Sequence, residues 1–244
     1  MAEVEIHADA TFDEPTLIEG LPGAGLVGKI TADHLVEELD MEWLGSCYCD
    51  GLPQVSVYRG ESMETMPPVR IYGDDDRDLL VLQSDVPVSP SQASAFTGCL
   101  VGWLESESVF PVFLSGLPEE KGEVPGVYGI ATGDGTDRLA DTDVTPPEQG
   151  GLISGPTGAL VHAANKRDLD GVALIAQSEV QFPDPEAARA VITRAIEPLV
   201  DIEIETETLV ERAEEIRAAR ERLAQQVHEG DDESTKATAI RGFQ

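Results

Sequence analysis

Three glycines near the start of the chain have the spacing of a dinucleotide-binding loop. Gly23, Gly25 and Gly28 form the pattern G-x-G-x-x-G between a short apolar run and an amphipathic segment. In such loops, backbone N–H groups at a helix start bind phosphates, and an acidic residue about twenty positions later binds the ribose. Asp50 lies 22 residues after Gly28, and Lys29 adds a cation. The pattern therefore predicts an anion or nucleotide site.

The same glycines also fit a structural role. Gly23 and Gly25 permit a tight turn from a strand into a helix, and Gly28 lets that helix approach the sheet. Pro22 and the lack of a recognisable second mononucleotide-binding half argue against a complete dinucleotide site. We favour the structural role, and a phosphate or small metabolite bound at this loop remains the alternative.

No other motif indicates catalysis. Ser115 and Ser154 lack the G-x-S-x-G elbow of a serine hydrolase. Cys47 and Cys49 are too close together for a zinc knuckle. The histidines show no H-x-x-x-H or H-E-x-x-H spacing; they are His7, His34, His162 and His228. We expect no catalytic residue, no metal ion and no cofactor.

The cysteines and the apolar runs bear on the compartment. Cys47 and Cys49 fall in a predicted strand and Cys99 in an apolar helix, which predicts three buried thiols. The segment Met1–Ala10 does not have the pattern of a signal peptide, and no apolar run approaches the ~18 residues of a membrane span. We therefore expect a cytoplasmic protein with no contact to a membrane.

The charge is strongly negative. Asp and Glu number 47 against 16 Lys and Arg, which gives a net charge of −31. Only four of the basic residues are Lys, and the acids are spread along the whole chain. Such a surface is typical of a salt-accumulating halophile, with an ordinary acidic mesophilic protein as the alternative. The absence of a basic stripe excludes nucleic acid as the expected partner.

Apolar patterning predicts alternating strands and helices. The expected strands are Glu3–Ala8, Thr16–Gly20, Trp43–Cys49, Gln54–Tyr58, Val69–Tyr72, Leu79–Gln83, Val109–Leu114, Gly126–Ala131 and Gly171–Ala176. The expected helices are Leu26–Leu39, Ser89–Glu105, Gly155–Lys166 and Asp184–Pro198, the last closed by its proline. We expect a hairpin turn at Asp74–Asp78 and a long surface excursion at Thr132–Gly150. The alternation indicates one α/β domain with a mostly parallel sheet between helices.

The C-terminal part differs in character. We divide the chain into an α/β domain at 1–205, an amphipathic charged helix at 206–228 and a flexible, disordered tail at 229–244. Leu209, Ile216 and Leu223 lie seven residues apart and form a narrow apolar seam. This helix either packs on its own domain or serves as an oligomerisation or partner helix. The chain ends with Phe243 one position before its last residue, Gln244.

Three segments in order resemble the proteasome assembly chaperone 2 family in its archaeal form. They are Gly20-Leu-Pro-Gly-Ala-Gly-Leu-Val-Gly-Lys29, Ser154-Gly-Pro-Thr-Gly-Ala-Leu160 and Pro183-Asp-Pro-Glu-Ala-Ala-Arg189. The resemblance covers about residues 15–225. It implies a three-layer α/β/α sandwich of the phosphorylase-like kind, homo-oligomers and no catalysis. It also implies binding to proteasome α subunits or the α-ring.

In that family a flexible tail ending hydrophobic–tyrosine–any residue enters pockets between α subunits. The matching positions here are Gly242, Phe243 and Gln244, so Phe replaces Tyr and Gly replaces the hydrophobic residue. Burial of the Phe243 ring could contribute about 1.5–3 kcal/mol. The resemblance therefore implies a proteasome-binding chaperone, and the alternative is a small-molecule enzyme, oxidoreductase or ligase-like, that uses the loop Gly23–Gly28.

The charge generates a prediction about salt. Because a net charge of −31 must be screened, we expect the folded state to require high ionic strength and to unfold on dilution below roughly molar salt. Circular dichroism across a KCl titration measures this. A melting temperature that stays unchanged down to millimolar salt would contradict the halophilic interpretation.

Overall fold

The computed structural model describes residues 3–211, apart from residues 9, 61–62, 90, 120–121, 123, 141 and 180–182. Within these residues the chain forms an eight-stranded sheet and a separate two-stranded ribbon. The sheet consists of β1 (Val4–Ile6), β2 (Thr16–Gly20), β3 (Glu42–Cys47), β6 (Val69–Asp74), β7 (Leu79–Ser84), β8 (Phe110–Pro118), β9 (Val127–Thr132) and β10 (Gly171–Ser178). The ribbon consists of β4 (Val57–Tyr58) and β5 (Thr65–Met66). The helices are α1 (Val27–Glu38), α2 (Ala93–Ser106), α3 (Thr136–Leu139), α4 (Gly155–Lys166), α5 (Pro185–Val191) and α6 (Glu197–Val200).

The sheet of the described residues is mixed, with the order β1-β3-β6-β7-β2-β8-β10-β9. Its central strands β7, β2, β8 and β10 pair in parallel. The outer strands β1, β3, β6 and β9 pair antiparallel with their neighbours. Followed across these pairings, β2, β3, β7, β8 and β10 run in one direction. The predicted α/β class with a mostly parallel sheet is therefore confirmed.

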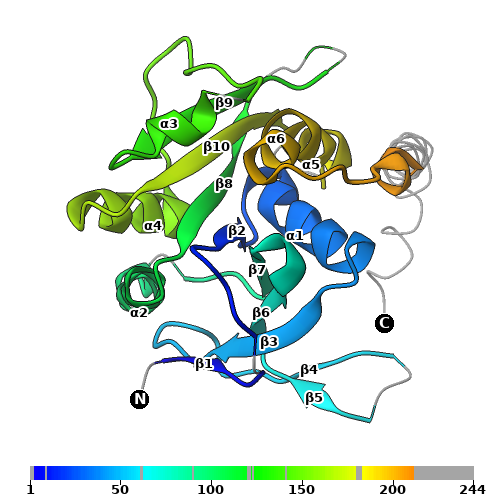
Figure 1. Ribbon diagram of the computed structural model, residues 1–244, viewed down its shortest axis with the longest axis vertical. Coiled ribbons are helices and arrows are strands. Elements are labelled where there is room, and N and C mark those ends of the chain that lie inside the picture. The colour runs from blue at the N-terminus through cyan, green and yellow to red at the C-terminus, as the bar shows by residue number, and fades with distance from the viewer. Residues whose placement is uncertain are drawn as a thin grey trace, which may run out of the picture.

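Helices cover both faces of the sheet, as Figure 1 shows. On one face lie α1, α5 and α6, and on the other lie α2 and α4. Consecutive residues of β2 pack on opposite faces of the sheet. Ile18 belongs to the core beneath α1, whereas Leu17 belongs to the core beneath α2. This follows from the twofold alternation of side chains along a strand. The more specific assignment to a phosphorylase-like sandwich stays a prediction.

The hairpin between β6 and β7 has the turn that the sequence predicts. A 3₁₀ turn at Asp75–Arg77 follows β6, and Asp78 has a φ of 47° in the left-handed region. The carbonyl oxygen of Asp78 accepts a hydrogen bond from the N–H of Thr16, which is the first residue of β2. The turn thus also positions the strand that leads into the glycine loop.

Two predicted segments differ in the structure. The expected strand Gln54–Tyr58 is paired only at Val57–Tyr58, because residues 54–56 have no neighbouring strand and are exposed. The expected surface excursion Thr132–Gly150 is partly structured. It contains α3, a bridge from Thr145 to β9, and Leu139 and Val144 packed against the core.

The prediction that Pro198 closes a helix is wrong. A π-helical turn at Ile192–Ile196 follows α5, and α6 then continues to Val200 with Pro198 in its first turn. A first-turn position tolerates proline because its N–H would have no partner within the helix.

The expectation of three free thiols is also wrong. Cys49, just after β3, forms a disulfide with Cys99 of α2, at a Cα–Cα distance of 5.8 Å. Cys47 alone among the cysteines stays a free, buried thiol. The sequence does not predict this pairing because the two partners lie 50 residues apart and meet only when α2 packs on the sheet.

The C-terminal helix is described only at its start. Residues 207–211 are helical, and Leu209 is fully buried in the core beneath α1. The rest of the predicted helix 206–228 and the whole predicted tail 229–244 lie outside the described residues. Among the helices that the structure does describe, none has the length and apolarity needed to cross a membrane.

Candidate functional site at the glycine loop

The glycine loop joins β2 to α1 through one 3₁₀ turn, Ala24–Leu26. Gly25 has a φ of +62°, and a Cβ at this position would lie 2.8 Å from the carbonyl oxygen of Glu179. The carbonyl oxygen of Gly25 accepts a hydrogen bond of 2.8 Å from the N–H of Asp184. By contrast, a Cβ at Gly23 would meet no atom within 4 Å. Gly25 is thus required both for the turn and for the close contact with the segment before α5.

A second contact requires small residues where α1 crosses the sheet. A Cβ at Gly28 would lie 3.1 Å from the carbonyl oxygen of Leu21 and 3.3 Å from that of Glu19. A Cβ at Gly20 would lie only 2.2 Å from the Cβ of Ala32. The helix therefore packs directly on the end of β2, which is the structural role that the sequence favours for Gly28.

The surroundings of Gly25 are rich in oxygen atoms. The carbonyl oxygen of Glu179 faces Gly25, and the carboxylate of Asp184 is buried nearby. That carboxylate accepts hydrogen bonds from the N–H groups of Glu179 at 2.9 Å and Ala187 at 3.1 Å. These oxygens repel a phosphate, so an anion at Gly23–Gly28 gains no support from this geometry and stays the alternative hypothesis.

Lys29 lies in the first turn of α1, and its ammonium group contacts carboxylates. The distance from its Nζ is 2.9 Å to Asp33 Oδ2 and 3.2 Å to Asp85 Oδ1. Asp85 also pairs with Arg70, whose side chain is fully buried, at 2.6 Å, and with Arg59 at 3.7 Å. Burial opposes ionisation of Asp85, but Arg70 and Lys29 outweigh it and hold the pKa of this carboxyl below its ordinary value. Lys29 is thus one member of a charge network at the end of β7.

Glu19 is a fully buried carboxyl group at the end of β2 and was not among the residues predicted from the sequence to form a site. Its oxygens accept hydrogen bonds from the N–H of Leu21 at 2.9 Å and the N–H of Leu114 at 3.1 Å. They also accept from the hydroxyl of Thr157 at 3.3 and 3.4 Å. Desolvation raises the pKa of Glu19 to about 7 despite these donors. The available signal was a single acid inside an otherwise apolar strand.

The position of Asp50 does not suit a ribose-binding acid. It follows β3, and β6 and β7 separate β3 from β2 in the sheet. With about 4.8 Å between neighbouring strands, Asp50 lies three strands, or roughly 14 Å, from the glycine loop across the sheet. In dinucleotide-binding folds that acid follows the strand adjacent to the loop strand.

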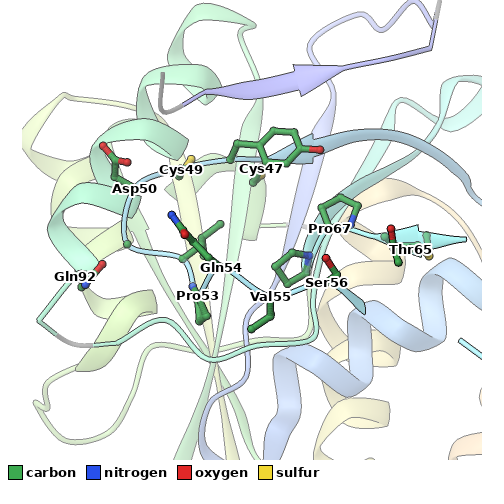
Figure 2. Close-up of a pocket in the computed structure, with 15 residues that line it drawn as sticks. Cys47, Cys49, Asp50, Pro53, Gln54, Val55, Ser56, Thr65, Pro67 and Gln92 are labelled. Atoms are coloured by element: carbon green, nitrogen blue, oxygen red, sulfur yellow. The ribbon is translucent and has the colours of Figure 1, made fainter. Parts of the chain in front are cut away.

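The described residues offer little else for chemistry. They contain no group of three His, Cys, Asp or Glu side chains that could hold a metal ion. His34 is buried and donates a hydrogen bond of 2.6 Å to the carbonyl oxygen of Glu205, so it has a structural partner. A separate open groove lies between the β3–β4 connection, residues 65–68 and Gln92 (Figure 2). Gly242, Phe243 and Gln244, the predicted partner-binding residues, lie outside the described part of the chain.

The fold and the packing of the loop define an α/β protein. Its glycine-rich turn packs against the segment before α5 of the same chain. The model of the PAC2 family matches residues 17–224, and the chain belongs to this family. It is 30% identical over 236 residues to an uncharacterized protein of Methanocaldococcus jannaschii, covering 94% of this chain and 89% of that protein.

Two solved structures from Pyrococcus furiosus are similar at 25% identity. One is PbaA, described as an archaeal homolog of proteasome-assembly chaperone, with a TM-score of 0.76 over 93% of this chain and 99% of that chain. The other is PbaB, described as an archaeal proteasome activator, with a TM-score of 0.75 over 92% of this chain and 100% of that chain. The family predicted from the three sequence segments is thereby confirmed.

The glycine loop gives a prediction with an internal control. Gly25→Ala should lower the free energy of unfolding by about 2 kcal/mol, because Ala is strained at this φ and its Cβ would meet Glu179. In a domain of this size that corresponds to a melting temperature about 4–8 °C lower. Gly23→Ala, where the added Cβ has open space, should melt within about 1 °C of the parent. Equal losses in both variants, measured by calorimetry in molar KCl, would contradict the assignment.

The buried carboxyl of Glu19 gives a prediction about pH. Its pKa rises from 4.5 in the unfolded chain to about 7 in the folded protein, so the folded state binds the proton more tightly. The stabilisation is complete below the unfolded pKa and is lost as the pH rises through the folded pKa. Relative to Glu19→Gln, the parent should therefore lose about 2–3 kcal/mol of unfolding free energy between about pH 5 and pH 8. Urea unfolding at both pH values measures the difference, and parallel profiles would show that Glu19 does not titrate as described.

Proposed function

We propose that this chain is a non-enzymatic, proteasome assembly chaperone-like protein that binds proteasome α subunits or the α-ring. The observation that carries the proposal is membership of the PAC2 family, together with the descriptions of PbaA and PbaB. Both relatives are similar over more than nine-tenths of this chain. A partner of the same class is therefore the simplest inference for this protein.

The geometry of the glycine loop supports a binding role over an enzymatic one. The close contacts at Gly25 and Gly28 are made to the chain itself, and Lys29 contacts Asp33 and Asp85. A nucleotide-dependent oxidoreductase or ligase would need this loop to face a ligand. No observation among the described residues favours that alternative.

We place part of the interaction in the last three residues, Gly242, Phe243 and Gln244. As a flexible tether, the eleven residues 229–239 would have an end-to-end distance of roughly 20 Å. That reach would let Phe243 and Gln244 enter a pocket while the folded domain rests on the ring. One such tail binds weakly, and several tails on one oligomer would raise the overall affinity through effective concentration.

Three further parts of the proposal concern salt adaptation, cellular compartment and oligomeric state. We propose a halophilic, cytoplasmic protein, in keeping with its net charge of −31. We also propose a homo-oligomer. Large apolar side chains on and after β3 are exposed, among them Trp43, Tyr48, Tyr58 and Met63. Exposed apolar patches mark interaction surfaces, and molar salt would screen the repulsion between acidic copies.

The tail is tested by co-sedimentation with purified archaeal proteasome α subunits in molar KCl. Deletion of Gly242–Gln244 should weaken binding by about tenfold or more, because the loss of a buried aromatic ring costs ~1.5–3 kcal/mol per tail. Phe243→Ala should reproduce most of this loss. Phe243→Tyr, the matched control, should bind as well as the parent or better, because it restores the family's hydroxyl group.

Folding and oligomeric state are measured in parallel by circular dichroism and light scattering. We expect all three variants to match the parent in both, so that weaker binding is assigned to the tail itself. Full-strength binding by the truncated chain would show that the folded domain carries the interaction. No binding by the parent at any salt concentration would overturn the proposed partner.

A further inference from the structure

The open groove has two walls from distant parts of the sequence. It has a volume of about 940 Å³, and residues 47–56, the last residue of β3 and the connection to β4, form one wall. Residues 65–68 and Gln92, just before α2, form the rest. Figure 2 shows this connection running from Cys49 and Asp50 toward Val55 and Ser56.

The disulfide Cys49–Cys99 joins the connection to α2. Cys49 is the second residue after β3, and Cys99 lies in the second turn of α2. Cys49 is only 4% exposed, whereas Cys99 is partly buried and packs against the same core. Gly98 beside it presents no side chain, and the space beyond it is open. Cys99 is therefore the more exposed residue of the pair.

The connection has few other attachments to the molecule. Gly51 has a φ of +100° and approaches Gln92 so closely that a Cβ would lie 2.6 Å from its carbonyl oxygen. Leu52 is partly buried against the core beneath α2, while residues 53–56 are exposed. The contact of Gly51 with Gln92 requires a constant distance between the β3–β4 connection and the start of α2. The disulfide fixes that separation covalently.

We propose that Cys49–Cys99 is a reversible redox site, reduced by a dithiol protein of the thioredoxin class, and that its reduction releases the 50–56 wall of the groove. This regulation goes beyond the proposed partner, and it rests on the proposed cytoplasmic compartment, which is reducing. Disulfides of proteins in reducing compartments are typically transient rather than structural.

The exchange balances with one dithiol reductant. A reductant thiolate attacks Cys99 Sγ, the Cys49–Cys99 bond breaks, and Cys49 leaves as a thiolate that takes up a proton. The second reductant thiol then attacks its partner sulfur in the mixed disulfide and releases Cys99 as a thiol. The protein gains two electrons and two protons, and the reductant becomes a disulfide. Cys47 is a poor internal attacker because burial raises the pKa of its thiol to about 12.

The experiment uses the full chain in molar KCl with a thioredoxin kept reduced by its reductase. Alkylation and mass spectrometry follow the thiols, and hydrogen–deuterium exchange follows the backbone. We expect reduction of Cys49–Cys99 in the folded protein, with exchange at residues 50–56 about tenfold faster or more and exchange in β2 and β8 unchanged. Cys99→Ser should show the fast exchange without any reductant.

Cys47→Ser is the matched control, because it removes a neighbouring buried cysteine but keeps the disulfide. It should oxidise, reduce and exchange as the parent does. A bond that is reduced only when the whole protein unfolds would overturn the redox site. Unchanged exchange at residues 50–56 in Cys99→Ser would overturn the release of the wall.

Discussion

The direct contact between α1 and the end of β2 is the constraint on which the rest of the molecule depends. Gly20 and Ala32 approach so closely that a single added Cβ would overlap. The helix can lie there only because the chain turns at once through Gly25, whose φ of +62° excludes most other residues without strain. The carboxyl group of Glu19 is enclosed by the same arrangement and bonds to β8 and α4.

This packing determines where the protein can act. In many α/β folds the carboxyl ends of the parallel strands form a crevice for a ligand. Here the carbonyl oxygen of Glu179 and the buried carboxylate of Asp184 occupy the space beside the glycine loop. Among the described residues, the accessible features include the groove beside Cys49 and the exposed apolar side chains after β3. The proposed function places the interaction on such surfaces, and two similar structures are described as a homolog of proteasome-assembly chaperone and a proteasome activator.

Local patterns predicted the local parts of this structure. The strand Thr16–Gly20 and the turn at Asp74–Asp78 follow from residue type and alternation, and the positive φ of Gly25 follows from a loop that must turn sharply. Features set by tertiary packing were not predictable. Cys49 meets Cys99 only across 50 residues, and Pro198 lies in the first turn of α6 instead of ending a helix. Likewise, no single sequence segment predicts the strand order, in which β6 and β7 separate β3 from β2.

The central claim is that this chain acts by binding proteasome α subunits rather than by converting a small molecule at its glycine loop. Electron cryo-microscopy of the full chain mixed with an archaeal α-ring in molar KCl tests it most directly. We predict density for the α/β domain on the ring face, with residues 242–244 between neighbouring α subunits and no ligand at Gly23–Gly28. Rings without bound protein, or a nucleotide held at the glycine loop, would contradict the account.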